Sequence, residues 1–334
     1  MRDRMRRGKM LVTGGTGFIG SAVVRRLLRE GYAVRVLDDD SRGCASRLAD
    51  VSAEIDWVRA DIRDGVAVQK ACRGVDSVCH LAFLNGTEYF YSKPELVLDI
   101  GVKGIVHVID GCMKEGVREL LLASSSEVYQ TPPSTPTDET VPLSIPDPMN
   151  PRYSYAAGKI ISEIMAINYG RRHFDRVIVF RPHNVYGPDM GWEHVIPQFA
   201  VRMSALSDRA DGAPIPFPVQ GSGKETRAFI FIDDFAEGFL HLVERGLHLE
   251  IYNIGTMEEI TIEQLAVKMA AIGGKRISIV PGKPAHGGTV RRCPNIEKLR
   301  SLGFQPRIPL EEGLRRTVRW YEENARNRPM EGRE

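Results

Sequence analysis

The sequence lacks the features that mark several classes of protein. No apolar run approaches the ~18–20 residues of a membrane-spanning helix, so we expect no membrane span. The few apolar residues after the basic start run at once into a glycine turn, so we expect no signal peptide either. The five cysteines are scattered without a CxxC pair, which predicts buried free thiols in a reducing cytoplasm and no metal site. They are Cys44, Cys72, Cys79, Cys112 and Cys293.

An excess of basic over acidic residues is also lacking outside the extreme N-terminus. The net charge of +2 depends on the first nine residues, which hold five cations and one anion, so the rest of the chain carries a net charge of −2. A domain that binds nucleic acid usually carries a basic stripe on its folded body, so this charge balance argues against such a partner. We interpret residues 1–8 as a flexible basic tail and residues 326–334 as a second tail.

What the sequence does contain is an alternation of short apolar runs and segments with helical periodicity. With 334 residues, of which 43% are apolar, the chain can bury a core for one large or two modest domains. Strands are predicted at residues 9–14, 33–40, 55–62, 75–82, 117–125 and 175–182, and helices at 18–31 and 94–116. This order predicts an α/β fold with a Rossmann-type, doubly wound parallel sheet that binds ligands beyond the carboxyl ends of its strands.

The pattern loosens after about residue 181 into proline- and glycine-rich segments. One late strand is predicted at residues 249–255 and a terminal helix at 310–325. We therefore expect a main sheet domain at residues 9–181, with returns near 228–255, and a smaller C-terminal lobe made mainly from residues 182–325.

The segment "TGGTGFIG" closes the first predicted strand and opens the first predicted helix. Gly14, Gly17 and Gly20 are spaced three apart, which allows a sharp turn and lets a pyrophosphate approach the amides of the helix N-terminus. Phe18 and Ile19 lie between them and belong to the same predicted dinucleotide site. The alternative is that these glycines merely pack a helix against a strand.

Asp38 ends the second predicted strand, about twenty residues after the glycine turn. Its carboxylate is placed to bind the adenosine ribose hydroxyls and to repel a 2′-phosphate, which favours NAD over NADP, although Arg42 nearby keeps NADP open. Asp61 and Ile62 follow the third predicted strand and are expected to border the adenine. Taken alone, Asp61 is equally typical of a strand-ending or helix-capping acid.

The segment "YSYAAGK" places Tyr155 and Lys159 four residues apart at the start of a helical pattern, so both side chains share one face. A lysine cation beside a phenol lowers its pKa, and the nicotinamide charge would lower it further, which suits Tyr155 to act as a base. The same spacing is common on solvated helix faces. The glycine turn and the serine-rich segment "SSSEVYQ" at residues 124–130, directly behind an apolar strand, favour the catalytic interpretation.

With these motifs together, the chain resembles an extended short-chain dehydrogenase/reductase of the NAD-dependent epimerase/dehydratase family, which acts on nucleotide-activated sugars. The resemblance covers about residues 9–325. Besides the segments above, it includes "HLA" at 80–82, "FRPHNVYGP" at 180–188, "GSGKETRAFIFIDD" at 221–234, "YNIG" at 252–255 and "RRCPNI" at 291–296. The resemblance implies NAD as cofactor, with Leu81 and Ala82 in its site, and makes residues 9–181 the NAD-binding domain and 182–325 mainly the substrate-binding lobe.

The resemblance also implies roles for single residues. Ser125, four residues before Tyr129, would be the hydroxyl that bonds the sugar oxygen, with Ser126 beside it in the catalytic group. Tyr155 would be the acid/base, and Lys159 would orient the nicotinamide ribose. The implied substrate-binding residues are Asn184, Val195, Arg227 and Arg292.

Arginine suits a diphosphate because its planar fork bonds phosphate oxygens in pairs. The resemblance implies that Asn184, Arg227 and Arg292 hold the diphosphate, and the two arginines suit this role. Two alternatives stay open, because Asn184 is also typical of a turn and Arg292 of a solvated surface.

The reaction depends on Glu127. In this family, oxidation at C4 gives a 4-keto sugar, and an epimerase returns the hydride to the other face. A dehydratase or decarboxylase instead exploits the acidity beside the ketone, and Glu127 would then be a second acid/base. "SSSEVY" resembles "STSEVYG" of UDP-glucuronate decarboxylases, and "TEYFYSKPE" at 87–95 is faintly similar to their tyrosine-bearing loop.

Other residues depart from the known branches. Ser125 stands where the dehydratases have threonine, Gln130 replaces the usual glycine after "VY", and residues 188–199 match no familiar substrate loop. Glu127 would alternatively brace a loop or bond a sugar hydroxyl. We predict a nucleotide-sugar C4 epimerase, with a decarboxylase or dehydratase as the alternative. A non-catalytic NAD-binding scaffold is the remote alternative, which the intact catalytic residues disfavour.

The resemblance implies a homodimer as well. Two helices per subunit, at residues 95–115 and 154–171, would pair across a two-fold axis into a four-helix bundle. The expected ligand partner is a nucleotide-diphosphate sugar, and the expected location is the cytoplasm.

Overall fold

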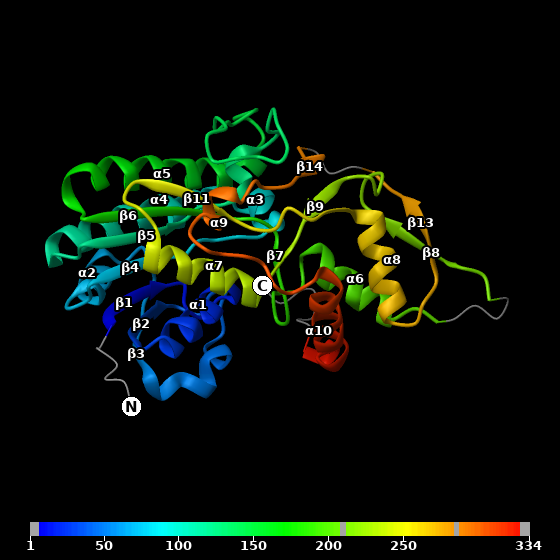
Figure 1. Ribbon diagram of the computed structural model, residues 1–334, viewed down its shortest axis with the longest axis horizontal. Helices are drawn as coiled ribbons and strands as arrows, with labels where there is room; N and C mark the ends of the chain where they lie inside the picture. Colours follow the sequence, from blue (N-terminus) through cyan, green and yellow to red (C-terminus); the bar gives the residue numbers. More distant parts are fainter. Residues whose placement is uncertain (1–6, 208–211, 284–286, 328–334) are drawn as a thin grey trace.

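A computed structural model describes residues 7–207, 212–283 and 287–327. Its main sheet has seven parallel strands in the order β11-β6-β5-β4-β1-β2-β3. The strands are β1 (Arg7–Thr13), β2 (Tyr32–Asp38), β3 (Ile55–Arg59), β4 (Ser77–His80), β5 (Glu119–Ala123), β6 (Arg176–Pro182) and β11 (Glu250–Ile254). The predicted doubly wound parallel sheet is therefore confirmed (Figure 1).

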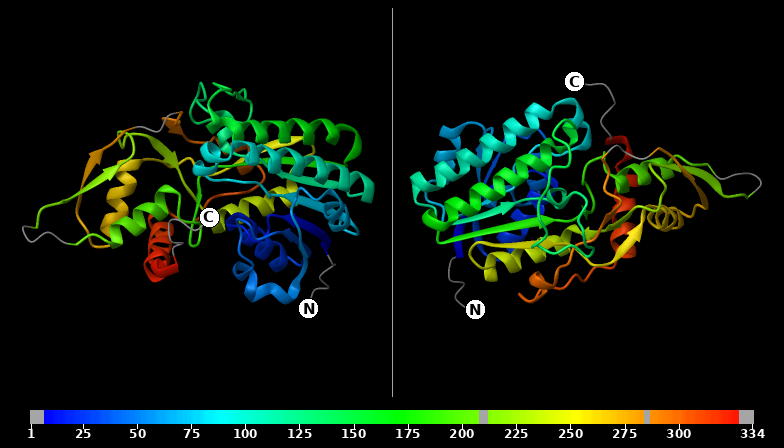
Figure 2. Two further views of the ribbon diagram at one scale, coloured as in Figure 1. Left: turned by 180° about the vertical axis from the view of Figure 1, so that it is seen from behind. Right: turned by 90° about the horizontal axis from the view of Figure 1, so that it is seen from above.

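Helices cover both faces of this sheet. One face carries α1 (Phe18–Arg29) and α7 (Ile232–Arg245), and the other carries α2 (Gly65–Cys72), α4 (Pro94–Glu115) and α5 (Ser154–His173) (Figures 1 and 2). Because both faces are covered, the central strands are continuous apolar runs rather than alternating ones. Leu120, Leu121 and Leu122 of β5 are all buried, and burial of each stabilises the fold by about 1.5–3 kcal/mol.

The helix termini follow from local sequence. Pro94 occupies the first turn of α4, where no intrahelical hydrogen bond is lost. Gly116 ends the same helix with φ of 71°, a conformation that glycine adopts without steric cost. The helix therefore spans the sheet in one unbroken run of 22 residues.

The order of the strands creates a ligand crevice. From β1 the chain adds β2 and β3 on one side and then crosses to β4 on the other side of β1. Connections leave β1 and β4 in opposite directions at such a switch point, so a crevice opens beyond their carboxyl ends. Thr13 and His80 end these two strands and are joined by a hydrogen bond of 2.8 Å between Oγ1 and Nδ1.

A smaller lobe extends from this sheet (Figure 1). Its helices are α6 (Val195–Ser204), α8 (Ile262–Ile272) and α10 (Leu310–Glu323). Its short strands are β7 (Val185–Tyr186) with β10 (Ile230–Phe231), β8 (Ile215–Val219) with β13 (Ile277–Pro281), and β9 (Thr226–Ala228) between β12 (Glu259–Thr261) and β14 (Arg291–Arg292). The remaining short helices are α3 (Thr87–Ser92), α9 (Glu297–Arg300), η1 (Ala45–Glu54), η2 (Ser126–Tyr129), η3 (Pro151–Tyr153) and η4 (Ala325–Asn327).

Two details concern the predicted tails and thiols. Residues 1–6 and 328–334 of the predicted tails lie outside the described residues, whereas Arg7 and Gly8 already belong to β1. All five cysteines are free, and four are buried, but Cys44 is exposed, so its predicted burial is wrong. Cys44 lies in the segment that links β2 to η1, outside the apolar layers, with its Sγ 2.9 Å from the Ser46 hydroxyl.

No helix among the described residues combines the length and apolarity that crossing a membrane requires.

Candidate active site

A cavity of about 650 Å³ lies in the crevice beyond the carboxyl ends of the strands. Its lining includes every predicted catalytic and cofactor residue, contributed by the glycine turn, the ends of β2 to β5, η2 and the start of α5. They are Gly14, Gly17, Phe18, Ile19, Gly20, Asp38, Asp61, Ile62, Leu81, Ala82, Ser125, Ser126, Glu127, Tyr155 and Lys159. Asn184, Val195 and Arg292 also line it, whereas Arg227 does not.

The glycine turn is shaped for a close anionic ligand. Gly14 has φ of +73° and donates its backbone N–H to the Leu37 carbonyl over 2.9 Å. A Cβ on Gly20 would lie only 2.0 Å from the Gly14 carbonyl oxygen, so the turn requires glycine there. Gly17 caps α1 without a side-chain hydrogen bond, which leaves the first amides of the helix free for a pyrophosphate.

The acid at the end of β2 is held at the rim of this turn. The two carboxylate oxygens of Asp38 accept hydrogen bonds from the backbone N–H of Thr16 (2.9 Å) and of Asp40 (3.0 Å). The carboxylate is fixed in the cavity lining with lone pairs left for ribose hydroxyls. The residues present therefore fit an NAD dinucleotide.

Arg42, which kept NADP open in the sequence, has other partners in the structure. Its Nη2 donates to the Asn85 carbonyl over 2.9 Å and lies 3.4 Å from the Glu193 carboxylate. Its guanidinium also stacks over the Tyr89 ring, 4.7 Å from the centroid. Because the Arg42 guanidinium is engaged in these contacts, it is not free to bind the 2′-phosphate of NADP.

Asp61 lines the cavity as part of an ion pair. Its oxygens accept hydrogen bonds from Arg63 Nε (3.1 Å) and Nη2 (2.6 Å), and these bonds lower the pKa of the Asp61 carboxyl. The acid is thus ionised and fixed beside Ile62, at the edge predicted for the adenine.

Lys159 is almost completely buried, with 3% of its surface exposed. Its Nζ donates to the Ala123 carbonyl at the end of β5 over 2.7 Å and lies 4.1 Å from the centroid of the Phe83 ring. Burial lowers the pKa of the Lys159 ammonium to about 7. The contacts therefore fix the lysine between α5 and the end of the strand.

Tyr155 lies against two aromatic rings and the Ser125 hydroxyl. Phe90 stacks on it at 4.9 Å between centroids, and Phe83 meets it edge-on at 5.1 Å. Burial raises the pKa of the Tyr155 phenol, and the hydrogen bond with Ser125 offsets only part of this rise. The predicted lowering of this pKa by Lys159 is therefore not produced by the protein's own groups, because the Lys159 Nζ is bonded to Ala123 and lies 5.8 Å from the Tyr155 ring centroid.

Ser125 caps the short helix η2, accepting the Glu127 backbone N–H at its Oγ over 3.2 Å. The Ser125 hydroxyl also hydrogen-bonds Tyr155, so the two residues present a hydrogen-bonded pair of hydroxyls at the cavity. Ser126 follows it, buried and in the lining of the same cavity.

Glu127 is held by arginines on both of its oxygens. Arg292 Nη1 donates to Oε1 over 2.9 Å, and Arg152 Nη2 lies 3.8 Å from Oε2. Burial by itself would raise the pKa of the Glu127 carboxyl, but these two guanidinium groups outweigh burial and hold the pKa below its usual value. Glu127 is therefore an ionised member of an arginine cluster.

Arg227 stands behind this cluster rather than in the cavity wall. Its Nη2 donates to the Thr289 carbonyl over 2.8 Å, and burial together with the neighbouring Arg292 lowers its pKa to about 10. Three guanidinium groups thus lie near Glu127, and Glu225 is a second carboxylate near Arg227, so positive charge exceeds negative charge in this cluster.

Asn184 and Val195 connect the cavity to the smaller lobe. Asn184 has φ of +41°, and its side-chain Nδ2 donates to the Ala228 carbonyl of β9 over 2.9 Å. Val195 is the first residue of α6. Both residues line the cavity. Asn184 therefore combines the turn conformation, which was the alternative interpretation of this residue, with a position in the cavity wall.

Two residues of the cavity lining have a buried polar atom without a hydrogen-bond partner among the described residues. They are Ser124, at Oγ, and Arg292, at Nε. Buried polar atoms are normally paired, so these two are consistent with a polar ligand in the cavity.

A buried network holds the catalytic turn in place. Arg181 of β6 bonds Glu163 of α5 in two places (2.9 and 2.6 Å), and its Nη1 donates to the Tyr129 hydroxyl over 2.7 Å. The Tyr129 hydroxyl in turn donates to Asn253 Oδ1 over 2.8 Å. Because Tyr129 ends η2, this network fixes the turn that carries Ser125 and Glu127.

The sequence-based reasoning missed Phe83, Phe90 and Arg152. Phe83 directly follows "HLA", where its apolar character was the only signal, and Phe90 lies within "TEYFYSKPE", which was compared with a loop of decarboxylases but not assigned to the site. Arg152 precedes Tyr155 by three residues, and only the fold brings it to Glu127.

The sequence and the fold of the chain are similar to those of known proteins. Residues 10–255 match the sequence profile of the NAD dependent epimerase/dehydratase family. The chain is similar to a putative UDP-glucose 4-epimerase of Methanocaldococcus jannaschii, with 32% identity over 95% of this chain and 99% of that protein. It is also similar to a UDP-N-acetyl-alpha-D-glucosaminuronate decarboxylase of Bacillus cytotoxicus, with 28% identity over 94% of this chain and 98% of that protein.

A similar fold is present in the dTDP-glucose 4,6-dehydratase DesIV from Streptomyces venezuelae, whose crystal structure contains NAD and TYD. The TM-score is 0.84, with 32% identity over 96% of this chain and 98% of that chain. These three relatives are named for three different reactions.

Proposed function

The chain belongs to the NAD dependent epimerase/dehydratase family, and we propose that within this family it is a nucleotide-sugar epimerase that inverts C4 through a transient 4-keto sugar. Membership makes it an NAD-dependent enzyme that modifies nucleotide sugars. Relatives of similar identity differ in their reactions, so the choice among epimerase, dehydratase and decarboxylase depends on the site. We further propose residues 9–181, with returns near 228–255, as the NAD-binding domain and residues 182–325 as mainly the substrate-binding lobe.

One observation carries the proposal, namely the two-sided arginine pairing of Glu127. A general acid or base works best with a pKa near the operating pH. Arg292 and Arg152 hold the Glu127 pKa below its usual value, which makes it a weak base and leaves it almost no proton to donate. Epimerisation needs no acid/base beyond Tyr155 and Ser125, so it is the reaction that this electrostatic setting favours.

In the proposed reaction the sugar lies against Ser125 and Tyr155. The Ser125 hydroxyl donates to the C4 oxygen, and Tyr155 exchanges the C4 hydroxyl proton. NAD bound in this cavity would supply the hydride chemistry at C4, and its positive charge would favour the ionised form of the Tyr155 phenol. Phe83 and Phe90 keep the Tyr155 ring in one orientation and exclude water from it.

The arginine cluster is proposed as the diphosphate site. Arg152, Arg227 and Arg292 carry three positive charges, whereas Glu127, and Glu225 near Arg227, carry two negative ones. A substrate diphosphate is the kind of anion that this positive excess attracts. Glu127 then keeps the Arg292 side chain oriented, so its role is to position an arginine.

The direct test follows C4 inversion by NMR of the anomeric protons. A panel of UDP, dTDP, GDP and CDP sugars is first screened by thermal shift, because a ligand that binds only the native state raises the melting temperature. Inversion at C4 of any hit, without loss of carbon or water, supports the proposal. Release of CO₂ or formation of a 6-deoxy-4-keto sugar contradicts it, and the absence of any reaction with every sugar supports the non-catalytic scaffold.

A decarboxylase is the second candidate. The observation that favours it is the meeting of Ser126, Glu127 and Arg292 in the wall of the same cavity, where a cation is available for a sugar carboxylate. A nucleotide-linked uronate that releases CO₂ with this protein would establish it.

We also propose a homodimer in the cytoplasm. The outer faces of α4 and α5 expose the apolar side chains of Met113, Ile161, Ile164 and Tyr169, with Ile164 54% exposed. Two such helices from each subunit would form a four-helix bundle that buries them. The five free thiols favour a reducing compartment.

A further inference from the structure

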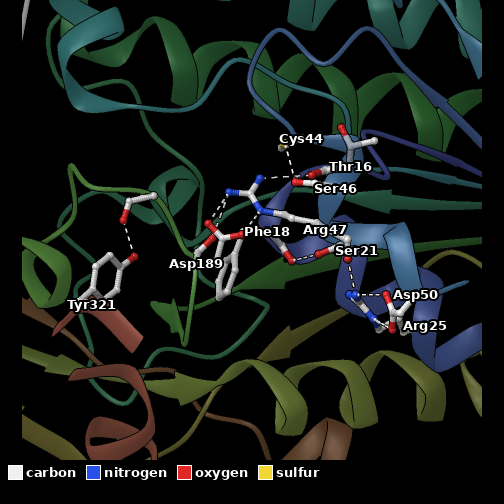
Figure 3. Close-up of polar contacts among 11 residues, drawn as sticks. Thr16, Phe18, Ser21, Arg25, Cys44, Ser46, Arg47, Asp50, Asp189 and Tyr321 are labelled. Carbon is white, nitrogen blue, oxygen red and sulfur yellow. Dashed lines mark hydrogen bonds and ion pairs between the residues drawn. The ribbon is translucent and has the colours of Figure 1, made fainter. Parts of the chain in front are cut away.

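Residues 189–193 form a strap between β7 and α6 at the mouth of the cavity. Met190 and Gly191 of this strap line the cavity. The outer side of the strap is anchored to α10, where the Tyr321 hydroxyl donates to the Gly191 carbonyl (Figure 3). The Trp192 ring also meets the Tyr321 ring edge-on, with centroids 5.0 Å apart. The strap is thus part of the smaller lobe.

The first end of the strap is joined to the dinucleotide side by one arginine. Arg47 donates from Nε to Asp189 Oδ2 over 2.7 Å and from Nη2 to Oδ1 over 2.9 Å. The third nitrogen, Nη1, donates to the Thr16 carbonyl in the glycine turn over 3.2 Å. A single guanidinium therefore links the strap to the turn that holds the pyrophosphate site (Figure 3).

The second end of the strap has a weaker link of the same kind. Glu193 lies 3.4 Å from Arg42, and Arg42 also bonds the Asn85 carbonyl over 2.9 Å. Both side chains are more than a third exposed, so salt screens this pair more than the Arg47–Asp189 pair. Both cations come from residues 42–47 after β2, and both anions stand at the ends of the strap.

These pairs lie at the same cavity as the predicted dinucleotide residues. The cavity lining includes Asp38, Arg42 and Arg47 together with Met190 and Gly191 of the strap. The strap and its two arginine partners therefore border the space into which a dinucleotide fits.

We propose that residues 189–193 close over the dinucleotide groove and that the Arg47–Asp189 and Arg42–Glu193 pairs latch them there, so that NAD stays bound between turnovers. The inference rests on the proposed function in one respect: an epimerase returns the hydride to its substrate and needs no exchange of the nucleotide. Release of NAD then requires the strap to open, which breaks a two-bond arginine–carboxylate pair. Mutations that break such a pair change mainly the rate at which the ligand dissociates, which here is NAD.

The experiment measures NAD release from the holoenzyme without any sugar. Protein loaded with radiolabelled NAD is mixed with excess unlabelled NAD, and retained label is followed at low and high salt. A charged hydrogen bond contributes about 1.5–3 kcal/mol, so Asp189→Asn and Arg47→Gln are expected to release NAD at least about tenfold faster. The charge swap Arg47→Asp with Asp189→Arg is expected to recover slow release.

Asp56→Asn is the matched control. Asp56 of β3 pairs with an arginine, Arg35, at 2.8 Å, and this pair is about as exposed as the Arg47–Asp189 pair, but neither of its residues lines the cavity. The control is expected to release NAD at the wild-type rate.

Unchanged release in Asp189→Asn, or equal acceleration in Asp56→Asn, overturns the latch. If a variant does not fold, the salt series on the wild-type protein decides, because the latch predicts faster release at high salt and salt-independent release contradicts it. Slow release in a protein that inverts no sugar leaves the latch in place and refutes only the proposed function.

Discussion

Replacing Glu127 by glutamine tests whether this carboxylate is an acid/base or an anchor for an arginine. Glutamine has nearly the same shape and keeps an oxygen that accepts the Arg292 hydrogen bond, but it carries no charge and is no base at neutral pH. If Glu127 only positions Arg292, turnover by C4 inversion falls by no more than about threefold. If Glu127 transfers a proton, the loss is about 10²–10⁴-fold, which is the usual contribution of general acid–base catalysis.

The same substitution has an effect on stability that depends on pH. A hydrogen bond to a charged group contributes about 1.5–3 kcal/mol and a neutral one about 0.5–1.5 kcal/mol, so the variant should lose roughly 1–2 kcal/mol of unfolding free energy at pH 7. The Glu127 pKa is lowered in the folded state, so this contribution is fully present above the unfolded pKa. It disappears as the pH falls through the folded pKa, and the two proteins should then be equally stable.

The assay pairs NMR of the anomeric protons with urea unfolding at pH 7 and below pH 4. Glu119→Gln is a suitable control, because Glu119 also pairs with an arginine, Arg176, at 2.7 Å, but at the opposite end of β5. Loss of all turnover in Glu127→Gln, with the control active, would refute the epimerase argument and favour the decarboxylase.

Three further outcomes are expected. Tyr155→Phe keeps the aromatic packing but removes the hydroxyl that we propose transfers the proton, so turnover should fall by at least about 10²-fold. NAD should remain bound, which the nucleotide content of the protein after gel filtration will report. Burial lowers the Lys159 pKa to about 7, so the unfolded chain binds more protons above that pH. The unfolding free energy of the nucleotide-free protein should therefore rise from pH 7 toward 10.5, by at most about 5 kcal/mol, and Lys159→Met should flatten this rise in urea titrations. Ile164→Glu places a charge on the exposed apolar face of α5, so light scattering should report a monomer, and a persisting dimer would contradict the four-helix bundle.

Much of the fold and of the cofactor site could be predicted because their signals are local. The glycine turn with Asp38, and Tyr155 with Lys159, are defined by spacing along a strand, a turn or one helix face. The Rossmann-type sheet followed from apolar runs that are buried on both faces. The helix α8 was missed although Thr261 and Gln264 form a capping box that marks its start.

The electrostatic state of the site could not be predicted in the same way. Arg152 and Arg292 reach Glu127 from segments far apart in the sequence, and burial of Tyr155 depends on Phe83 and Phe90. Spacing carries no information about desolvation, which is why the lowering of the Tyr155 pKa by Lys159 was predicted although burial raises this pKa in the protein alone. The strap contacts likewise join residues more than a hundred positions apart.

The position of β11 at the edge of the sheet has a consequence for synthesis on the ribosome. β6 ends at Pro182, but its neighbour β11 begins only at Glu250, and Asn253 within β11 completes the hydrogen bonds of Tyr129. At a translation rate of about 5–20 residues per second, the edge of β6 stays unpaired for several seconds. An unpaired apolar edge invites association with other nascent chains, so the growing polypeptide should depend on chaperones until its third quarter has emerged.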